Sequence, residues 1–200
     1  MPATLPPNCQ KIYDGIMFNI YHCDVELFDG SKAKFEYLTR QDSVTILAFP
    51  SPDTIILTRQ EQPGRPEPFI DFPGGRVDEG ETHEQAALRE FQEETGYKIG
   101  RIITFKHFAL MGSTRFEKTF FVATDLQKIN EINHHEPGEK IEIFIESIDK
   151  VLEHCHNWKL RQTDGMLCFL NIMHNPKINK QITSWLNNST SADSNRNLAS

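Results

Sequence analysis

The sequence predicts a mixed α/β (α+β) fold in which a sheet packs between helices. Three observations lead to this prediction: β-branched and aromatic segments precede one central helix, similar segments follow it, and further helical segments come late in the chain. With 200 residues, the chain fits one domain with extensions. We divide it into an N-terminal extension and hairpin (residues 1–42), a main domain (43–186) and a tail (187–200). We expect the tail to be disordered because Asn, Ser, Thr and Ala dominate it.

The part of the chain before the central helix is predicted to form strands. Ile16–Phe28 and Ala33–Thr39 are rich in β-branched and aromatic residues, and Asp29-Gly30 between them is a hairpin signal. Further strands are expected at Val44–Phe49, Thr54–Arg59 and Phe69–Phe72. The polar segment Gln60–Pro68 is rich in Pro and Gly, so we interpret it as a loop.

The central helix is predicted from its two ends. Thr82 is a good N-cap, and Gln85 three residues later completes a capping-box pattern. Gly96 suits the left-handed position that follows the C-terminus of a helix. Because Glu84–Thr95 contains no Pro or Gly, we expect a helix over about Thr82–Thr95.

After this helix the pattern returns to strands and then changes to helices. The expected strands are Ile102–Phe108, Thr119–Thr124 and Ile141–Ile145. The expected helices are Ile148–His154 and Thr163–Met173. Asp125–Gly138 is polar and is predicted to be a loop.

One face of the central helix is strongly acidic. Glu90, Glu93 and Glu94 stand at i, i+3 and i+4 and therefore share a face, where Arg89 compensates only part of their repulsion. A bare pattern of this kind is usually a solvated helix surface. Carboxylate oxygens are also the ligands that hard divalent cations prefer, so the face is a candidate metal site.

The spacing around these residues favours the metal site. From Gly75 to Tyr97 the chain fits G-x5-E-x7-R-E-U-x-E-E-x-G-U at every fixed position, where U is apolar or aromatic. A chance match has a frequency on the order of one in a billion per start position. This stretch is the Nudix box, and the chain resembles a Nudix hydrolase. The resemblance implies an α/β/α sandwich with a mixed central sheet and an enzyme that cleaves phosphorus anhydrides.

The resemblance also implies roles for the box residues. Glu90, Glu93 and Glu94 would hold Mg²⁺, with Mn²⁺ as a substitute, and a main-chain carbonyl at Gly74 would complete the site. Glu93 and Glu94 thereby count among the catalytic residues. The resemblance further implies that Glu81 and Arg89 support the loop and the helix through charge-assisted hydrogen bonds.

The general base is expected outside the box, because metal-bound carboxylates are poor bases. Glu139 follows Gly138, a potential hinge, and matches an acidic loop of the resembling branch. We therefore rank Glu139 first, Glu136 second and Glu142 third, with Glu117 as a further candidate.

The segments that flank the box resemble the ADP-ribose pyrophosphatase branch of the family. The similar stretches are IILTRQEQPGRPEPFIDFPGG, GEKIEI and Leu160–Met173, together with the N-terminal hairpin. The leading hypothesis is therefore Mg²⁺-dependent hydrolysis of a nucleoside diphosphate linked to a group X, with ADP-ribose giving AMP and ribose 5-phosphate. Other substrates stay open, because Gln62 stands where the branch often has Arg, and Ala109-Leu110-Met111-Gly112 occupies the region after the box where the branch typically has a Pro.

Two alternatives follow. One is a hydrolase of GDP-mannose, another nucleotide sugar or a dinucleoside polyphosphate. The other is a ligand-binding Nudix module without catalysis, although such modules usually lose a box carboxylate and this chain keeps all of them. Arg59, Arg65 and Arg115 are the candidates for contact with substrate phosphate, and each could instead be an ordinary surface arginine.

Composition restricts the partners and the location. A net charge of −7 and a pI of about 5.6 argue against nucleic acid or an anionic membrane as a general partner. The N-terminus lacks a signal peptide pattern and no apolar run is long enough to span a bilayer, so we expect a cytoplasmic protein. Four cysteines without zinc spacing are expected to be reduced thiols: Cys9, Cys23, Cys155 and Cys168. The similar branch implies a homodimer that uses the hairpin.

Overall fold

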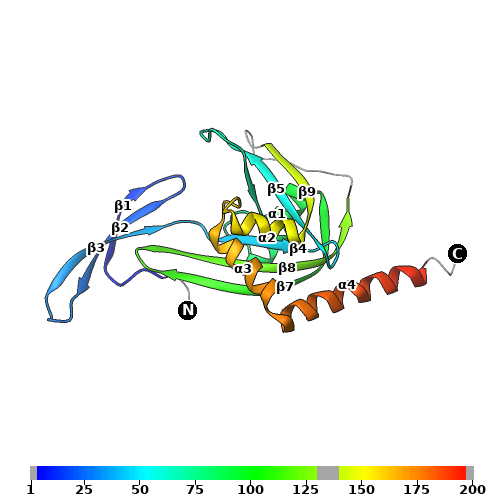
Figure 1. The fold of residues 1–200 in the computed structure, drawn as a ribbon. Helices are drawn as coiled ribbons and strands as arrows, with labels where there is room; N and C mark the ends of the chain where they lie inside the picture. The colour runs from blue at the N-terminus through cyan, green and yellow to red at the C-terminus, as the bar shows by residue number, and fades with distance from the viewer. Residues whose placement is uncertain (1–3, 130–139, 197–200) are drawn as a thin grey trace.

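The computed structural model describes residues 4–129 and 140–196 of the chain, with side chains up to residue 186. In chain order its elements are β1 (Cys9–Asp14), β2 (Asn19–Glu26), β3 (Lys32–Thr39), β4 (Ser43–Ala48), β5 (Thr54–Glu61), β6 (Phe69–Asp71), α1 (His83–Thr95), β7 (Tyr97–Met111), β8 (Thr114–Lys128), β9 (Lys140–Ser147), α2 (Ile148–His156), α3 (Thr163–His174) and α4 (Pro176–Arg196). Figure 1 shows their arrangement. Within these residues no helix combines the length and the apolarity that crossing a bilayer requires.

The strands form two sheets. The larger sheet has the order β1-β2-β3-β8-β4, and β7 pairs with the other edge of β8 along nearly its whole length. Its β3–β8 and β4–β8 pairs are parallel and its other pairs are antiparallel, which confirms the predicted mixed sheet. The smaller sheet is antiparallel, with the order β6-β5-β9.

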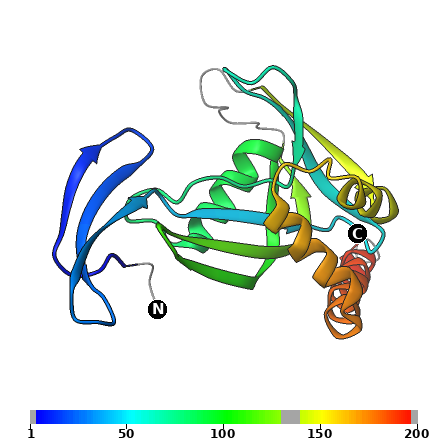
Figure 2. The same cartoon turned by 60° about the vertical axis from the view of Figure 1, so that its left-hand side comes forward.

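The two faces of β4 and β8 pack against different helices. Ile46 and Phe121 belong to a core formed with Phe91 of α1. Leu47 and Phe120, one residue away on each strand, belong to a second core formed with α2, α3, α4 and the smaller sheet. Because neighbouring side chains of a strand point to opposite faces, the two strands form the middle layer of the predicted sandwich (Figures 1 and 2).

The N-terminal strands extend away from this sandwich. The predicted hairpin is present as β2 and β3, and β1 adds a third antiparallel strand to it. This ribbon, blue in Figures 1 and 2, joins the main sheet through two residue pairs, Leu38↔Thr114 and Thr39↔Arg115. Its exposed apolar side chains include Ile16, Phe18 and Phe28.

Two of the cysteines differ from the prediction. Cys9 and Cys23 form a disulfide between β1 and β2, where the two residues are direct cross-strand partners. The prediction of reduced thiols was wrong for this pair because spacing along the chain does not reveal strand register. Cys155 and Cys168 are free and buried, and burial raises the pKa of each thiol to about 11.

The C-terminal tail also differs, because α4 continues to Arg196 where disorder was expected from residue 187. Ile178, Ile182 and Leu186 recur at helical spacing and pack against the larger core, which anchors the first part of the helix. No Pro or Gly follows them to stop the helix. Residues 197–200 lie outside the described part of the chain.

Candidate active site

The acidic helix is fixed at both ends and along its apolar face. Thr82 is its N-cap, and both hydrogen bonds of the predicted capping box with Gln85 are present. Gly96 follows the helix with a φ of 68°, as a left-handed cap requires. The core side of the helix is fully buried at Ala87 and Phe91, so the carboxylates of the other face point into a pocket.

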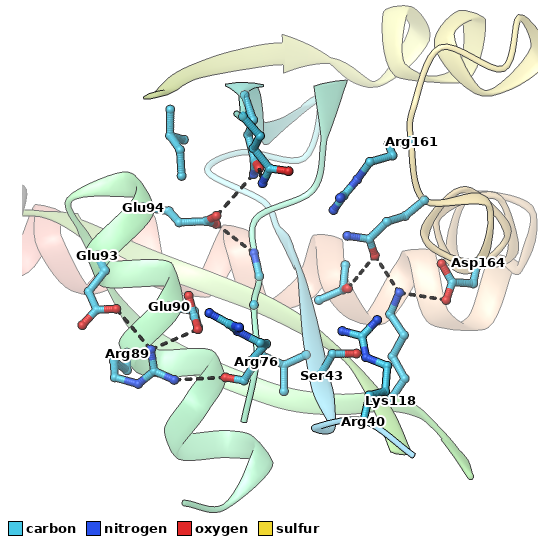
Figure 3. Close-up of a pocket in the computed structure, with 18 of the residues that line it drawn as sticks. Arg40, Ser43, Arg76, Arg89, Glu90, Glu93, Glu94, Lys118, Arg161 and Asp164 are labelled. Atoms are coloured by element: carbon cyan, nitrogen blue, oxygen red, sulfur yellow. Dashed lines mark hydrogen bonds and ion pairs between the residues drawn. The ribbon is translucent and has the colours of Figure 1, made fainter. Parts of the chain in front are cut away.

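Arg89 is the centre of the acidic region (Figure 3). Its Nε and one terminal nitrogen donate hydrogen bonds to the two carboxylate oxygens of Glu81, and both donor–acceptor distances are 2.9 Å. The other terminal nitrogen lies 3.0 Å from Glu90 and 3.2 Å from Glu93. A further bond of 3.0 Å reaches the main-chain oxygen of Arg76. One guanidinium therefore joins the loop before α1 to two carboxylates of the helix, and it lowers the pKa of Glu81.

Glu94 is held by different partners. One of its oxygens accepts a hydrogen bond from the main-chain nitrogen of Gly74 at 2.9 Å, and the other accepts one from the side-chain amide of Gln60 at 3.3 Å. Gln60 is buried on β5 and is itself bonded to Thr58. The carboxylate of Glu94 thus has a defined position next to the backbone that enters the box.

Two glycines make room for this arrangement. A Cβ atom at Gly75 would collide with the carboxyl group of Glu90, and one at Gly74 would collide with the main-chain oxygen of Val44. Gly74 also has a φ of 150°, a conformation that favours glycine. The carbonyls of Pro73 and Gly75 both accept hydrogen bonds from main-chain N–H groups of β4. Gly74, between them in the chain, lines the pocket and donates its own N–H to Glu94.

Burial affects the carboxylates unequally. Glu90 is more buried than Glu93, and burial raises the pKa of Glu90 although Arg89 acts in the opposite direction. The side chain of Glu93 is 37% exposed and can reach the cavity. The donor set consists only of oxygens, namely the three carboxylates and the carbonyl of Gly74. Such a set fits Mg²⁺, which retains several waters and needs few protein ligands.

The opposite side of the pocket is cationic. Figure 3 shows Arg40, Lys118 and Arg161 across from the carboxylates, with Arg76 between the two sides. Burial lowers the pKa of Arg40, and the positive charges of Arg76 and Arg161 lower it further. Three guanidinium groups are therefore close enough to repel one another, an arrangement that favours an anionic ligand.

The cationic side chains are positioned by acidic and amide partners, of which Asp71 is buried. Arg161 donates to the fully buried Asp71 over 2.8 Å. Burial raises the pKa of Asp71, and the hydrogen bond from Arg161 opposes this effect. The ammonium of Lys118 lies 2.7 Å from Gln162 and 2.8 Å from Asp164 at the start of α3.

The carboxylates and the cations line one cavity of about 600 Å³. This volume falls within the range of about 300–1,000 Å³ that is typical of small-molecule sites. Met17, from the connection between β1 and β2, also lines it. A diphosphate can therefore lie with metal-bound oxygens at α1 and its remaining oxygens at the arginines.

The arginines predicted to contact substrate lie outside this cavity. Arg59 is exposed because it alternates on β5 with Thr58 and Gln60, which face inward. Arg65 stacks on Phe69 and lines a separate, smaller cavity. Arg115 stacks on Tyr37 at the base of the ribbon.

Besides Arg89, which the sequence indicated, three other arginines among the described residues line the cavity and were missed: Arg40, Arg76 and Arg161. Arg76 could have been suspected, because it lies inside the box next to Gly75. Arg40 and Arg161 carry no comparable signal, because they lie in the connections β3–β4 and α2–α3, which tertiary packing brings to the pocket.

The candidates for the base are only partly described. Glu139 and Glu136 lie outside the described residues, although β9 begins at the next residue, Lys140, and Ile141 lines the cavity. Glu142 is exposed on β9 opposite Arg59. Glu117 contacts His107, and neither residue is among those that line the cavity.

Comparison with known proteins agrees with this geometry. The family model of the NUDIX domain matches residues 39–164, and the chain belongs to the Nudix family. An ADP-ribose pyrophosphatase of Bacillus subtilis (strain 168) is 28% identical over 147 residues, which cover 72% of this chain and 78% of that protein. A methanol dehydrogenase activator of Bacillus methanolicus is 25% identical over 146 residues, 72% of this chain and 79% of that protein.

A solved structure supports the fold. The crystal structure of an ADP compounds hydrolase superposes with a TM-score of 0.69, covering 84% of this chain and 90% of that chain at 20% identity. The likeness confirms the predicted Nudix fold with its mixed sheet.

The packing of Glu90 against Gly75 gives the first testable prediction. Gly75→Ala should displace the Glu90 carboxylate and raise the Mg²⁺ concentration for half-maximal activity by about 10–100-fold, the usual cost of disturbing the support of a metal ligand. Gly112→Ala is the matched control, because nothing lies within 4 Å of a Cβ at that position. Metal titrations of both variants test this, and equal behaviour would refute the packing argument.

Proposed function

We propose that this protein hydrolyses the pyrophosphate bond of a nucleoside diphosphate linked to a group X, with ADP-ribose as the leading substrate. One observation carries the proposal: a single cavity places three box carboxylates opposite Arg40 and Arg161, with Arg76 between the two sides. The similarity to a Bacillus subtilis protein named ADP-ribose pyrophosphatase supports this choice of substrate.

The chemistry follows from the two sides of the cavity. Mg²⁺ held by Glu90, Glu93 and Glu94 would neutralise phosphate oxygens and activate a water. The guanidinium groups would bind the remaining oxygens through charge-assisted hydrogen bonds and stabilise negative charge that develops on the leaving phosphate. Mn²⁺ is the proposed substitute, because its preference for oxygen ligands is similar.

The role of general base is assigned to Glu139. Glu94 has its two oxygens in hydrogen bonds, and Arg89 contacts both Glu90 and Glu93, so the box carboxylates are already engaged. Chain connectivity supports the choice, because Glu139 directly precedes β9 and Ile141 of that strand lines the cavity.

A homodimer that uses the N-terminal ribbon is also proposed. The exposed apolar side chains of the ribbon and of the neighbouring end of β7 are Ile12, Tyr13, Ile16, Met17, Phe18, Leu27, Phe28, Phe35, Phe108, Leu110 and Met111. Monomeric proteins seldom expose so many large apolar groups in one region. Because Met17 reaches the cavity, an interface at the ribbon would also border the site. Cytoplasmic location stays a prediction.

Metal dependence is tested by Glu93→Gln and Glu94→Gln. Each change removes a carboxylate charge from the proposed metal site but leaves the apolar face of α1 intact. We expect kcat to fall by orders of magnitude while the circular dichroism spectrum and Tm stay close to those of the unchanged protein. Glu153→Gln, on an exposed pair with Lys150, serves as the control. Full activity with EDTA would exclude the metal assignment.

Substrate identity is tested with a panel that contains Mg²⁺ and is scored for release of nucleoside monophosphate. ADP-ribose should give AMP and ribose 5-phosphate with the highest kcat/KM. A tenfold higher kcat/KM for GDP-mannose or a dinucleoside polyphosphate would assign a different substrate class. Binding without hydrolysis of any member would favour the non-catalytic module.

The base is tested by Glu139→Gln, which should lower kcat about 10²–10⁴-fold, the usual contribution of a general base. Metal binding should be retained, because the box is unchanged. Glu136→Gln and Glu142→Gln, measured at saturating Mg²⁺, are the comparison variants. Normal kcat in Glu139→Gln would remove it from the mechanism.

Light scattering tests the dimer, which should have twice the chain mass of 23.0 kDa at micromolar concentration. The double substitution Ile16→Asp and Phe28→Asp should convert the dimer to a monomer, because it places negative charges on the ribbon. Trp158→Asp, at an exposed position between α2 and α3, is the control. A monomeric mass for the unchanged protein would contradict the proposal.

A further inference from the structure

A second group of ionisable side chains lies away from the box carboxylates. Asp42 precedes β4, His83 begins α1, and Glu117 lies on β8. Because Glu93 follows His83 by ten residues, the two side chains stand about 15 Å apart along the helix. Glu117 and Thr119 flank Lys118 on its strand and so point away from the face on which Lys118 meets Asp164.

The group is organised around the hydroxyl of Thr119. The Nδ1 atoms of His83 and His107 both contact this hydroxyl, the latter over 2.9 Å. The Nε2 atom of His83 lies 3.3 Å from a carboxylate oxygen of Asp42, and that of His107 lies 3.3 Å from one of Glu117. The other oxygen of Asp42 accepts the main-chain N–H of Glu117.

These contacts restrict where the protons of the two imidazoles and the Thr119 hydroxyl can lie. The Thr119 hydroxyl has one hydrogen, so it can donate to only one Nδ1 and must accept an N–H from the other. The second imidazole, when neutral, then directs the lone pair of its Nε2 at a carboxylate oxygen. Two acceptors at 3.3 Å repel each other unless a proton or a metal cation lies between them.

We propose that Asp42, His83 and Glu117 bind a divalent transition metal such as Zn²⁺, at a site separate from the catalytic one. One ligand atom from each residue lies within 4.8 Å of the others. Tetrahedral Zn²⁺ with bonds of about 2.0–2.2 Å holds two ligand atoms about 3.3–3.6 Å apart, so binding would draw the three side chains closer together.

Charge and ligand type support this choice of ion. Two carboxylates and two neutral imidazoles carry a net charge of −2, which a dication balances. Imidazole favours Zn²⁺ and its neighbours over Mg²⁺, which selects sites built from oxygen alone. The hydrogen bond that Nδ1–H of His83 would donate to the Thr119 hydroxyl orients the ring and leaves the lone pair of Nε2 for the metal, as the outer partners of metal-bound histidines do. His107 acts as a positioning residue through Thr119 and Glu117.

The site would join three parts of the catalytic framework. It connects the first turn of α1 to β8 and to the residue before Ser43, which lines the active-site cavity. A bound ion would therefore stabilise the position of the box helix on the sheet, without contact with substrate.

The test measures Zn²⁺ bound per chain by equilibrium dialysis in excess Mg²⁺, which occupies the box. His83→Asn and Glu117→Gln are compared with two controls. His22→Asn removes an exposed histidine that pairs with Glu36 on the ribbon, and Glu93→Gln alters the box. Circular dichroism without metal checks the fold of each variant.

We expect one tightly bound Zn²⁺, a Tm raised by about 5–10 °C at 100 times the Kd, and retention of both effects in the controls. His83→Asn and Glu117→Gln should weaken binding by more than the roughly 10–100-fold cost of losing an outer partner. Co²⁺ added to the unchanged protein should give visible absorption bands of a site with a histidine ligand. Absence of tight Zn²⁺ binding, its survival in His83→Asn, or its loss in Glu93→Gln would overturn the proposal.

Discussion

The active site depends on the hydrogen bonds of one guanidinium, that of Arg89. It binds Glu81 with two parallel bonds, reaches Glu90 and Glu93, and holds the carbonyl of Arg76. Its side chain is 30% exposed, so solvent screens these contacts only in part. Without this cation the carboxylates of α1 would repel one another and the loop before the helix would lose its main attachment.

The cavity results from contacts between parts of the chain that lie far apart in the sequence. The box supplies the anionic side, whereas Arg40 precedes β4 and Arg161 precedes α3. Parallel pairing of β4 with β8 and the bond from Arg161 to buried Asp71 bring these segments together. A pocket with opposite charges on facing sides can bind a metal complex of a phosphate anhydride, which carries both positive and negative groups.

Local signals predicted the box helix closely, because its caps depend on residues at fixed short spacing: Thr82, Gln85 and Gly96. Features set by tertiary contacts were not predictable in this way. β7 and β8 extend beyond their predicted ranges because each pairs with the other over nearly its whole length. The helix α4, which continues into the tail as far as Arg196, is anchored where Ile182 and Leu186 reach the core.

The same limit applies to the site residues. Arg59 was chosen for its charge and its position near the box, but the side-chain alternation of β5 turns it to solvent. The bond between Cys9 and Cys23 depends on a register that the sequence does not state. The box carboxylates were identified because their helical spacing alone places them on one face.

The most direct measurement is the Mg²⁺ dependence of kcat in Arg89→Lys. Lysine keeps the positive charge but cannot bind Glu81 bidentately while it also contacts Glu90 and Glu93. Arg101→Lys is the control for an arginine-to-lysine change, because Arg101 pairs with a different acid, Asp125. The account predicts that kcat falls by about 10–100-fold although every carboxylate remains, because their support is lost. An unchanged kcat and Mg²⁺ requirement would show that the guanidinium does not organise the site.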